Sequence, residues 1–362
     1  MALTHLSLTH LRNISNQKLS PGNGLNFIVG DNGSGKTSIL EAIYLLGRAR
    51  SFRTHQIKQV VSSDADQLVV VGKLDGNGTP LTIGYSYDKS SKSTIRINGQ
   101  NVRTSAELAN HFPLLFIGSD TGRLLGSGER QRRRCLDWGV FHVEHRFLPA
   151  WQKYNKALKQ RNASLKQCSR ELTSVWDKEL ASSGEEITLI RKQYVEKLKP
   201  IFFEYLDQLV SDKVKVTNLS FEQGWSKTAS SLLTYLEENY QRDTELGYTQ
   251  RGPHRSDLKL DIEHGALAKF GSGGQQKLIT CALLLSQVAL YKKETGQNCT
   301  ILVDDLPAEL DPLFRESFIR LLVSLETQLF ITATEAALID VNDVENKKMF
   351  HVEHGKVKAL DD

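Results

Sequence analysis

The glycine-rich segment 30–37, GDNGSGKT, has the residue types and the spacing of a phosphate-binding P-loop. Its glycines let backbone N–H groups turn inward around phosphate oxygens, helped by the positive end of the helix expected after it. The Lys36 side chain would reach the β- and γ-phosphates, and the Thr37 hydroxyl would ligate Mg²⁺. A tight turn without a ligand is the alternative, but an apolar strand before the segment and a helix after it favour ATP binding. The residues expected to contact the nucleotide are Gly30, Asp31, Asn32, Gly33, Ser34, Gly35, Lys36, Thr37 and Ser38.

A second group of candidates follows the apolar stretch in ILVDDLPAELD, residues 301–311. A P-loop enzyme needs a carboxylate for the magnesium shell and a group that orients the attacking water. Asp304 directly follows Ile-Leu-Val and is expected to hold the metal together with Thr37. Asp305 is the candidate general base or water-orienting group, so Lys36, Asp304 and Asp305 are expected to be catalytic. A strand end that is merely capped by acidic residues is the alternative.

A second glycine-rich turn, in FGSGGQQK at 270–277, opens an apolar run with the length of a buried helix. A turn of this kind at a helix start favours an anion. The stretch is similar to the signature motif of ABC-type ATPases, which caps a nucleotide held by the P-loop of a second subunit. Because one phosphate cannot easily sit on two helix starts of one rigid domain, two subunits arranged head to tail would close each other's sites. We therefore predict an ATP-dependent homodimer in which Ser272, acting in catalysis, contacts the partner's ATP with Gly273 and Gly274; a simple surface turn is the alternative.

The surrounding sequence predicts the strands and helices that position these motifs. Residues 38–47 read as a helix, and residues 67–103 alternate between apolar and polar types around glycine turns, which predicts antiparallel hairpins. Short buried strands are expected at 25–30, 114–118, 300–305 and 328–334. Long, charged, helix-periodic segments fill the middle of the chain. The predicted fold is therefore α/β, an ABC-type P-loop ATPase domain with an antiparallel β subdomain, split by a mostly helical second lobe. The expected divisions are 1–122, 123–245 and 246–362.

The charge of the chain restricts how it could bind DNA. There are 46 basic and 42 acidic residues, a net charge of +4, which is too mild to indicate nucleic-acid binding by itself. A DNA site must then be a local patch. Residues 151–172 fit one amphipathic helix with Trp151, Tyr154, Leu158, Leu165 and Leu172 on one side and basic residues on the other. Candidates for phosphate contacts are Arg130, Arg132, Arg133, Arg134, Lys156, Lys159, Lys166 and Arg170, with a solvated face or a protein-binding face as the alternative.

Other features exclude some classes of protein. No stretch reaches eighteen apolar residues, and the first residues lack the pattern of a secretion signal, so we expect a cytoplasmic protein without membrane contact. Four scattered cysteines are expected to be reduced and buried. The pentapeptide FHVEH occurs at 141–145 and at 350–354, but the lack of further ligands makes coincidence a better explanation than zinc.

The order of motifs along the chain resembles the RecF recombination-repair family, in the SMC-like branch of ABC ATPases. The resemblance rests on the first fifty-odd residues with their P-loop and on LDWGVFHVE, KALKQRNASLK, YTQRGPHRSDLKL, GQQKLITCAL and VDDLPAELD, in that order. It implies an ATP- and Mg²⁺-dependent dimer that binds gapped DNA at single-strand/duplex junctions, and that works with the mediators RecO and RecR to load recombinase. It also implies that Arg12 approaches the phosphates or the base, and that Asp311 lies in a subunit-contacting loop.

Two other functions remain possible at this point. A transporter's nucleotide-binding subunit uses the same ATP machinery, but it usually has a histidine after the strand that follows the acidic motif. Thr332 and Thr334 occupy that stretch here. The second possibility is a clamp in which ATP joins two subunits without turnover. Asp305, where many ABC proteins have glutamate, predicts slow, switch-like hydrolysis stimulated by DNA, and the side chains of His254 and Arg255 could serve a turn, the nucleotide or DNA.

Overall fold

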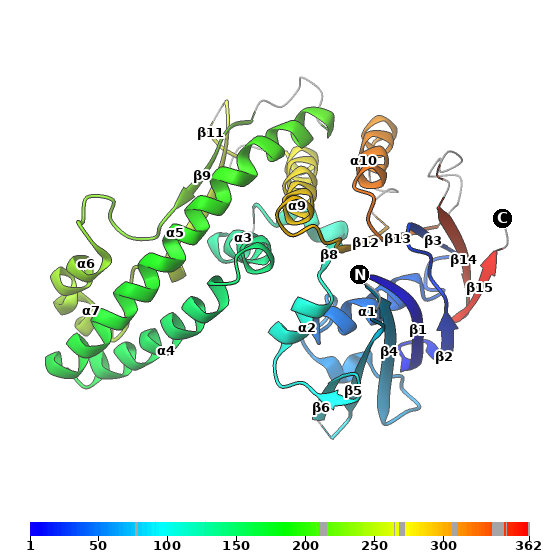
Figure 1. Ribbon diagram of the computed structural model, residues 1–362, viewed down its shortest axis with the longest axis horizontal. Helices are drawn as coiled ribbons and strands as arrows, with labels where there is room; N and C mark the ends of the chain where they lie inside the picture. Colours follow the sequence, from blue (N-terminus) through cyan, green and yellow to red (C-terminus); the bar gives the residue numbers. More distant parts are fainter. Residues whose placement is uncertain are drawn as a thin grey trace. The chain divides into compact units, whose positions relative to one another are not determined.

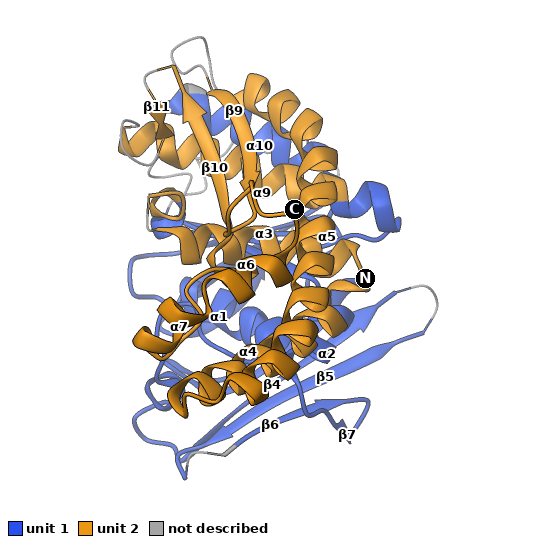
Figure 2. Ribbon diagram, turned by 90° about the vertical axis from the view of Figure 1, so that its left-hand side faces the viewer, with its two compact units in different colours: residues 1–121, 291–362 blue, residues 122–290 orange. Residues whose placement is uncertain are grey.

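The computed structural model describes most of the chain: residues 1–76, 79–90, 92–126, 128–209, 216–263, 265–267, 272–305, 310–334, 344 and 346–360 (Figure 1). It forms two compact units (Figure 2). Unit 1 comprises Met1–Thr121 and Tyr291–Asp362, and unit 2 comprises Gly122–Leu290. The first division is one residue from the expected position, whereas the second lies well beyond residue 245. The reason is that the strands at 257–262 and 265–266 and most of the helix at 273–295 belong to the same compact unit as the helical segment, although they follow residue 245.

Among the described residues, unit 1 contains two six-stranded sheets. The first has the order β2-β1-β4-β5-β6-β7, and its neighbouring strands are antiparallel, as the alternating sequence predicted. A hydrophobic face of this sheet supplies Leu6, Leu8, Val70 and Tyr85 to the core. Its strands are β1 Ala2–Leu11, β2 Ile14–Leu19, β4 Gln67–Asp75, β5 Leu81–Asp88, β6 Lys92–Ile97 and β7 Gln100–Asn101.

The second sheet of unit 1 has the order β15-β14-β3-β13-β12-β8. Strands β14, β3, β13, β12 and β8 run parallel, and β15 is an antiparallel edge. Every residue of β3 and β13 is buried, which explains their mostly apolar sequences. The strands are β3 Leu25–Val29, β8 Leu114–Ile117, β12 Thr300–Asp304, β13 Leu329–Ala333, β14 Lys347–Glu353 and β15 Lys356–Leu360.

Helix α1, Lys36–Arg48, lies between the two sheets. Its side chains Ile39, Leu40 and Ile43 are fully buried, in one cluster with residues of both sheets. The shorter helices of this unit are α2 Ser105–His111 and α10 Pro312–Ser324. Because α1 follows β3 directly, the turn between them sits where the parallel strands end. The predicted strands and the predicted helix of this unit are therefore confirmed.

Unit 2 is mostly helical, with a small antiparallel sheet in the order β11-β10-β9. Strand β9 falls inside the segment predicted to be helical. The long helix of the second glycine turn is α9, Gly273–Thr295, whose last residues belong to unit 1. The other elements are α3 Glu129–Val143, α4 Phe147–Lys166, α5 Arg170–Leu209, β9 Val216–Glu222, α6 Leu232–Glu238, α7 Tyr240–Leu246, β10 Asp257–Ile262 and β11 Gly265–Ala266.

The prediction of one helix over 151–172 is wrong. Helix α4 ends at Lys166 and α5 begins at Arg170, because Cys168 adopts a left-handed conformation with φ 53°. Leu172 is therefore half exposed instead of lying on the buried face. Cys168 is also exposed, which corrects the expectation for that thiol, whereas the other three cysteines are buried and all four are free.

The side chains of Arg161 and Arg191 are fully buried in the helical unit. Arg161 Nε donates to Asp177 Oδ1 at 2.6 Å, and its Nη1 donates to Asp243 Oδ2 at 2.7 Å. Arg191 donates through Nε and Nη2 to both carboxylate oxygens of Asp137, at 2.8 Å each. These charge-assisted bonds join residues far apart in the sequence, so they fix how the helices of the unit pack.

Candidate nucleotide-binding site

The P-loop has the backbone that a phosphate cradle requires. Gly30, Gly33 and Gly35 have φ values of 151°, 80° and 121°, in the region that favours glycine. A Cβ on Gly30 would collide with the carbonyl oxygen of Val352, whereas a Cβ on Gly33 would meet nothing within 4 Å. The loop is thus packed on the sheet at its start and open at its tip, where Asp31, Asn32 and Gly33 are exposed.

Two contacts from elsewhere in unit 1 hold this loop. The Asn13 amide donates to the carbonyl oxygens of Gly33 and Ser34, at 3.2 and 3.1 Å. The backbone N–H of Gly355, in the turn between β14 and β15, donates to the Ser34 carbonyl at 2.8 Å. These bonds occupy carbonyl oxygens on the outside of the loop. Its N–H groups can therefore serve a phosphate.

The Lys36 ammonium lies against the loop that precedes it. Its Nζ donates to the carbonyl oxygens of Gly30 at 2.6 Å and Asp31 at 3.0 Å. Burial lowers the pKa of Lys36, while the nearby carboxylates oppose that shift. A phosphate would supply a stronger counter-charge than two carbonyl dipoles, so this lysine is placed to exchange one for the other.

The acidic motif lies next to the P-loop through one hydrogen-bonded chain. Thr37 Oγ1 donates to Asp304 Oδ1 at 2.9 Å, and Thr332 Oγ1 donates to the same oxygen at 2.9 Å. The Asp305 N–H in turn donates to Thr332 Oγ1 at 2.9 Å. Strand β13 carries Thr332 and lies between β3 and β12. The strand order therefore brings Thr37, Asp304 and Asp305 together across more than 260 residues of sequence.

The acidic residues in this series of hydrogen bonds are suited to binding a cation. Burial raises the pKa of Asp304, and the hydrogen bonds from Thr332 and Thr37 only partly offset that rise. Asp305 has a left-handed backbone, φ 53°, an uncommon conformation for a residue other than glycine. Two buried atoms, Ser34 Oγ and Asp305 Oδ1, have no hydrogen-bond partner within the described residues. A phosphate oxygen and a metal-bound water would satisfy them, so the residues present fit ATP and Mg²⁺.

The Arg12 side chain, predicted to approach the nucleotide, is hydrogen-bonded to Glu41 and to the Gln59 carbonyl. Its Nε and Nη2 donate to both oxygens of the fully buried Glu41, at 2.9 Å each, and its Nη1 donates to the Gln59 carbonyl at 2.8 Å. Ser51 also donates a short hydrogen bond to Glu41. Arg12 thus neutralises a buried acid on α1, and its contact with the nucleotide stays a prediction.

The second glycine turn forms the start of α9 in unit 2. Ser272 Oγ accepts from the Gln275 N–H at 3.3 Å, and Gln275 Oε1 accepts from the Ser272 N–H at 2.9 Å, which is a capping box. Ser272, Gly273 and Gly274 are exposed. A Cβ on either glycine would meet nothing within 4 Å, so packing inside the described chain does not require glycine there. Gly271, the first glycine of this turn, lies outside the described residues.

The basic candidates in unit 2 fall into two sets. Arg132 pairs with both oxygens of Asp257, at 2.8 and 2.7 Å, and Arg133 donates to the Ser256 carbonyl at 2.6 Å. Both side chains are only 13% exposed. By contrast, exposed positions are held by Lys156, Lys159, Lys166 and Arg170, the last with its guanidinium 4.2 Å from the Tyr240 ring. Arg134 is exposed. No described group of three or more metal-ligating side chains lies near either FHVEH copy or elsewhere in the described residues.

His254 serves a turn. Its Nδ1 lies 2.6 Å from the Tyr154 hydroxyl, and its Nε2 lies 3.1 Å from the Thr249 carbonyl. Burial lowers the pKa of His254 to about 4, so it is neutral near pH 7. Arg255, next to it, is exposed.

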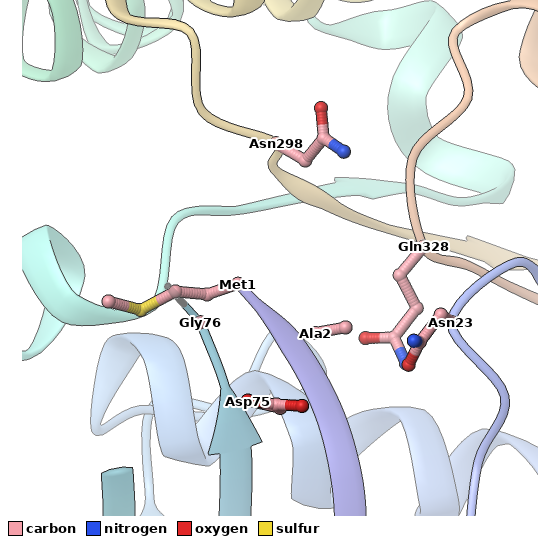
Figure 3. A pocket seen from close by; sticks show the side chains of 7 residues that line it. All are labelled: Met1, Ala2, Asn23, Asp75, Gly76, Asn298 and Gln328. Atoms are coloured by element: carbon pink, nitrogen blue, oxygen red, sulfur yellow. The ribbon is translucent and has the colours of Figure 1, made fainter. Parts of the chain in front are cut away.

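A polar pocket of about 380 Å³ lies at the start of β1 (Figure 3). Its buried member Gln328 donates to the carbonyls of Leu3 and Gly22, at 2.8 Å each, and accepts from the Leu3 N–H. The amide therefore fastens β1 to the start of β13. The lining residues are Met1, Ala2, Asn23, Asp75, Gly76, Asn298 and Gln328, none of which was a predicted site residue. No helix in the described part of the chain has the length and apolar character needed to span a membrane.

The sheet order and the P-loop chemistry together define the ABC class of P-loop ATPase folds, in its SMC-like form. The family model described as RecF/RecN/SMC N terminal domain matches residues 2–358, and the chain belongs to this family, on its RecF branch. It is 44% identical to the DNA replication and repair protein RecF of Pseudomonas aeruginosa strain LESB58, over 99% of this chain and 97% of that protein. It is 42% identical to the protein of the same name from Stutzerimonas stutzeri strain A1501, over 99% and 98%.

Solved structures agree with the sequence relatives. The recombination mediator protein RecF with ATP, described in the RecFOR pathway, matches with a TM-score of 0.86 and 28% identity, over 99% of this chain and 98% of that one. An SMC head bound to the C-winged helix domain of ScpA matches with a TM-score of 0.63 at 14% identity, which supports the fold alone. The predicted fold and the predicted family are confirmed.

Proposed function

We propose that this protein is an ATP-dependent DNA-binding protein of recombinational repair and replication restart, acting in the cytoplasm. The single observation that supports this most is the hydrogen-bonded chain from Thr37 through Asp304 and Thr332 to Asp305. It joins a phosphate-binding turn to the Asp304 carboxylate and to the backbone of Asp305, which brings together the residues that ATP hydrolysis needs. The names of the relatives supply the biological setting.

In this proposal the residues of unit 1 hold Mg-ATP. Lys36 moves from its carbonyl partners to the phosphates, and the N–H groups of residues 31–38 surround them. Mg²⁺, held by Thr37 and Asp304, would neutralise charge on the phosphates. Asp305 orients the attacking water, aided by its buried oxygen that lacks a partner among the described residues. A carboxylate one methylene shorter than glutamate favours slow turnover, so we expect a weak, DNA-stimulated ATPase.

We further propose that ATP drives dimerisation. Ser272, Gly273 and Gly274 are exposed at the start of a long helix, and nothing within the described chain occupies the space beside the two glycines. A second copy could therefore bring its triphosphate against them, and each subunit would complete the other's site. Asp311, exposed next to the start of α10, is proposed to lie in the contact between subunits.

DNA would be bound through phosphate contacts that read no sequence. The exposed lysines of α4, Lys156, Lys159 and Lys166, are the strongest candidates, together with Arg170. Arg132 and Arg133 contribute less in this proposal, because their donors are already used within unit 2. The preferred DNA would be gapped, with single-strand/duplex junctions, and the partners would be RecO and RecR.

The test is ATP binding, DNA binding and phosphate release by the purified full chain. Lys36→Ala should abolish ATP binding, and Ser272→Arg should keep ATP binding while blocking ATP-dependent pairing and hydrolysis. Phosphate release that rises on adding gapped DNA supports the ATPase switch. ATP-dependent pairing on DNA with no release at any DNA concentration would instead identify a clamp, and unchanged ATP affinity in Lys36→Ala would refute the P-loop assignment.

A further inference from the structure

A pocket of about 390 Å³ in unit 2 combines aromatic rings with positive charge. It lies around the end of β9, the turn before β10 and helix α6. Its volume is within the roughly 300–1,000 Å³ typical of small-molecule sites. The lining residues are Glu129, Glu222, Gln223, Gly224, Trp225, Ser226, Lys227, Tyr235, Arg251 and Arg255.

The backbone around this pocket is fixed by close packing of two turns. A Cβ on Gly224, which has φ 92°, would collide with the Gly252 carbonyl and lie 2.6 Å from the Ser256 nitrogen. The Gly252 N–H donates to the Gly224 carbonyl at 3.1 Å. Trp225 follows the first turn, and Arg251 and Arg255 flank the second, so these side chains line one pocket although they are distant in sequence.

The charges in the pocket are unevenly matched. Both acids already have cations: Glu222 pairs with Lys259 at 2.6 Å, and Glu129 pairs with Arg133 at 3.7 Å. Lys227, Arg251 and Arg255 are exposed, and within the described residues none of their side chains has an ion pair or a hydrogen bond. The pocket therefore presents three cations that no acid neutralises.

The rings in the pocket are accessible as well. Trp225 and Tyr235 are half-buried, and each leaves part of its surface to the solvent. Unpaired bases stack on aromatic side chains, and arginines bind the phosphate and stack on bases. Paired bases inside a duplex do not offer their faces in this way. Rings and unmatched cations together thus fit a nucleotide unit with an unstacked base.

We propose that this pocket binds an unpaired nucleotide of single-stranded DNA, with the base against Trp225 and Tyr235 and the phosphate on Arg251 and Arg255. The proposal rests on the DNA binding proposed above and gives it a strand preference: α4 would contact phosphates of either form, whereas the pocket would contact only an unpaired strand. The pocket would then hold the single-stranded side of a junction.

The experiment measures binding by the full chain with Mg-ATP. The probes are a labelled oligothymidylate of about 16 nucleotides, a blunt duplex of equal length, and dTMP. Trp225→Ala should weaken oligothymidylate binding by roughly 5- to 150-fold, the range for one stacked base. Arg251→Ala should weaken it as well, because the substitution removes a phosphate contact. Duplex binding should change much less. Trp225→Phe should keep most of the affinity, because it keeps a ring, and Arg103→Ala, an exposed arginine of unit 1, should match the unaltered protein.

A second measurement does not depend on how the alanine variants fold. The chain has four tryptophans, and oligothymidylate should quench the emission of the unaltered protein but not the emission of Trp225→Phe. Unchanged affinity in both Trp225→Ala and Arg251→Ala would overturn the pocket, as would equal losses for duplex and single strand. Tight dTMP binding without any gain from a longer strand would reassign it to a free nucleotide. If the unaltered protein binds neither DNA, the proposed DNA-binding function fails too, whereas strong binding with unaffected variants rejects the pocket alone.

Discussion

Thr332 joins the Asp304 carboxylate to the Asp305 backbone in the nucleotide site. The substitution Thr332→Val removes its hydroxyl at nearly constant volume. The hydroxyl donates to Asp304 Oδ1 and accepts from the Asp305 N–H, both at 2.9 Å. The substitution therefore loosens both acids at once but leaves the P-loop contacts of Lys36 in place. We expect ATP binding to persist and Mg²⁺-dependent hydrolysis to fall.

The size of the effect follows from the removal of these two hydrogen bonds. A hydrogen bond to a charged group contributes about 1.5–3 kcal/mol, and a buried N–H left without a partner costs a similar amount. The two effects share one hydroxyl and do not simply add, so we expect the free energy of unfolding to fall by about 2–3 kcal/mol. Removing a group that orients a metal-binding residue typically reduces activity by about 10- to 100-fold, which is the decrease we expect in kcat.

The pH profile of the activity of Thr332→Val should shift in a definite direction. Burial raises the pKa of Asp304, and the Thr332 hydrogen bond lowers it. Without that bond the pKa of Asp304 rises further. Mg²⁺ needs the ionised carboxylate, so the acidic limb of the activity profile should move to higher pH.

The assay is phosphate release at saturating ATP while Mg²⁺ and pH are varied, with ATP affinity measured separately. Thr334→Val is the matched control, because Thr334 is half-buried and the described residues include no hydrogen-bond partner for its side chain. Thr332→Ser should recover most of the activity, since it restores the hydroxyl. Unaltered kcat and an unmoved acidic limb in Thr332→Val would refute the role of the hydroxyl in positioning the acids.

Three further perturbations test other parts of the molecule. Asp304→Asn should abolish Mg²⁺-dependent hydrolysis yet raise the Tm of the nucleotide-free protein. The reason is that folding raises the pKa of Asp304, so the folded protein loses stability as the pH increases through that pKa and the carboxyl group ionises. Calorimetry at pH 5 and pH 8 should therefore find the larger gain in Tm at pH 8. Arg161→Met should lower the free energy of unfolding by about 3–5 kcal/mol, since it leaves Asp177 and Asp243 buried without their cation, whereas Lys159→Met, on the exposed face of the same helix, should change urea unfolding little. Charge reversal at Lys156, Lys159 and Lys166 should weaken DNA binding and reduce the slope of log affinity against log salt by about 0.9 for each duplex phosphate that the protein no longer neutralises; an unchanged slope, or the same change after reversing Lys178 and Lys192 on α5, would assign that face to another role.

Much of the nucleotide site could be predicted because its parts are local motifs. Residues 30–38 combine a strand, a turn and a helix start in one continuous segment, and Asp304 ends an apolar strand. Each pattern therefore has a short-range physical cause. The trans pairing and the roles assigned to Ser272 and Asp305 remain predictions.

The contacts that hold the site could not be predicted, because they join distant segments. Asn13 and Gly355 brace the P-loop from two separate hairpins. Thr332 is next to Asp304 only because β13 lies between β3 and β12, and strand order is not visible in local sequence.

Unit 2 was predicted less well for a related reason. Charged residues in a helical segment favour a solvated face, but Arg161 and Arg191 are fully buried and paired with acids from other helices. The helical spacing of apolar residues in 151–172 continues through the break at Cys168. A single residue with a left-handed backbone does not change that spacing, so the pattern could not reveal the break. Strand β9 was missed inside a helix-rich segment, where its pairing with β10 decides its conformation.

The most direct test of ATP-controlled pairing is the mass of the full chain in solution, measured by sedimentation with and without Mg-ATP. We expect 40.7 kDa without nucleotide and about twice that mass with it, and we expect Ser272→Arg to stay at the lower mass. A protein that saturates with ATP but keeps the mass of one chain, alone and on gapped DNA, would contradict the shared nucleotide site.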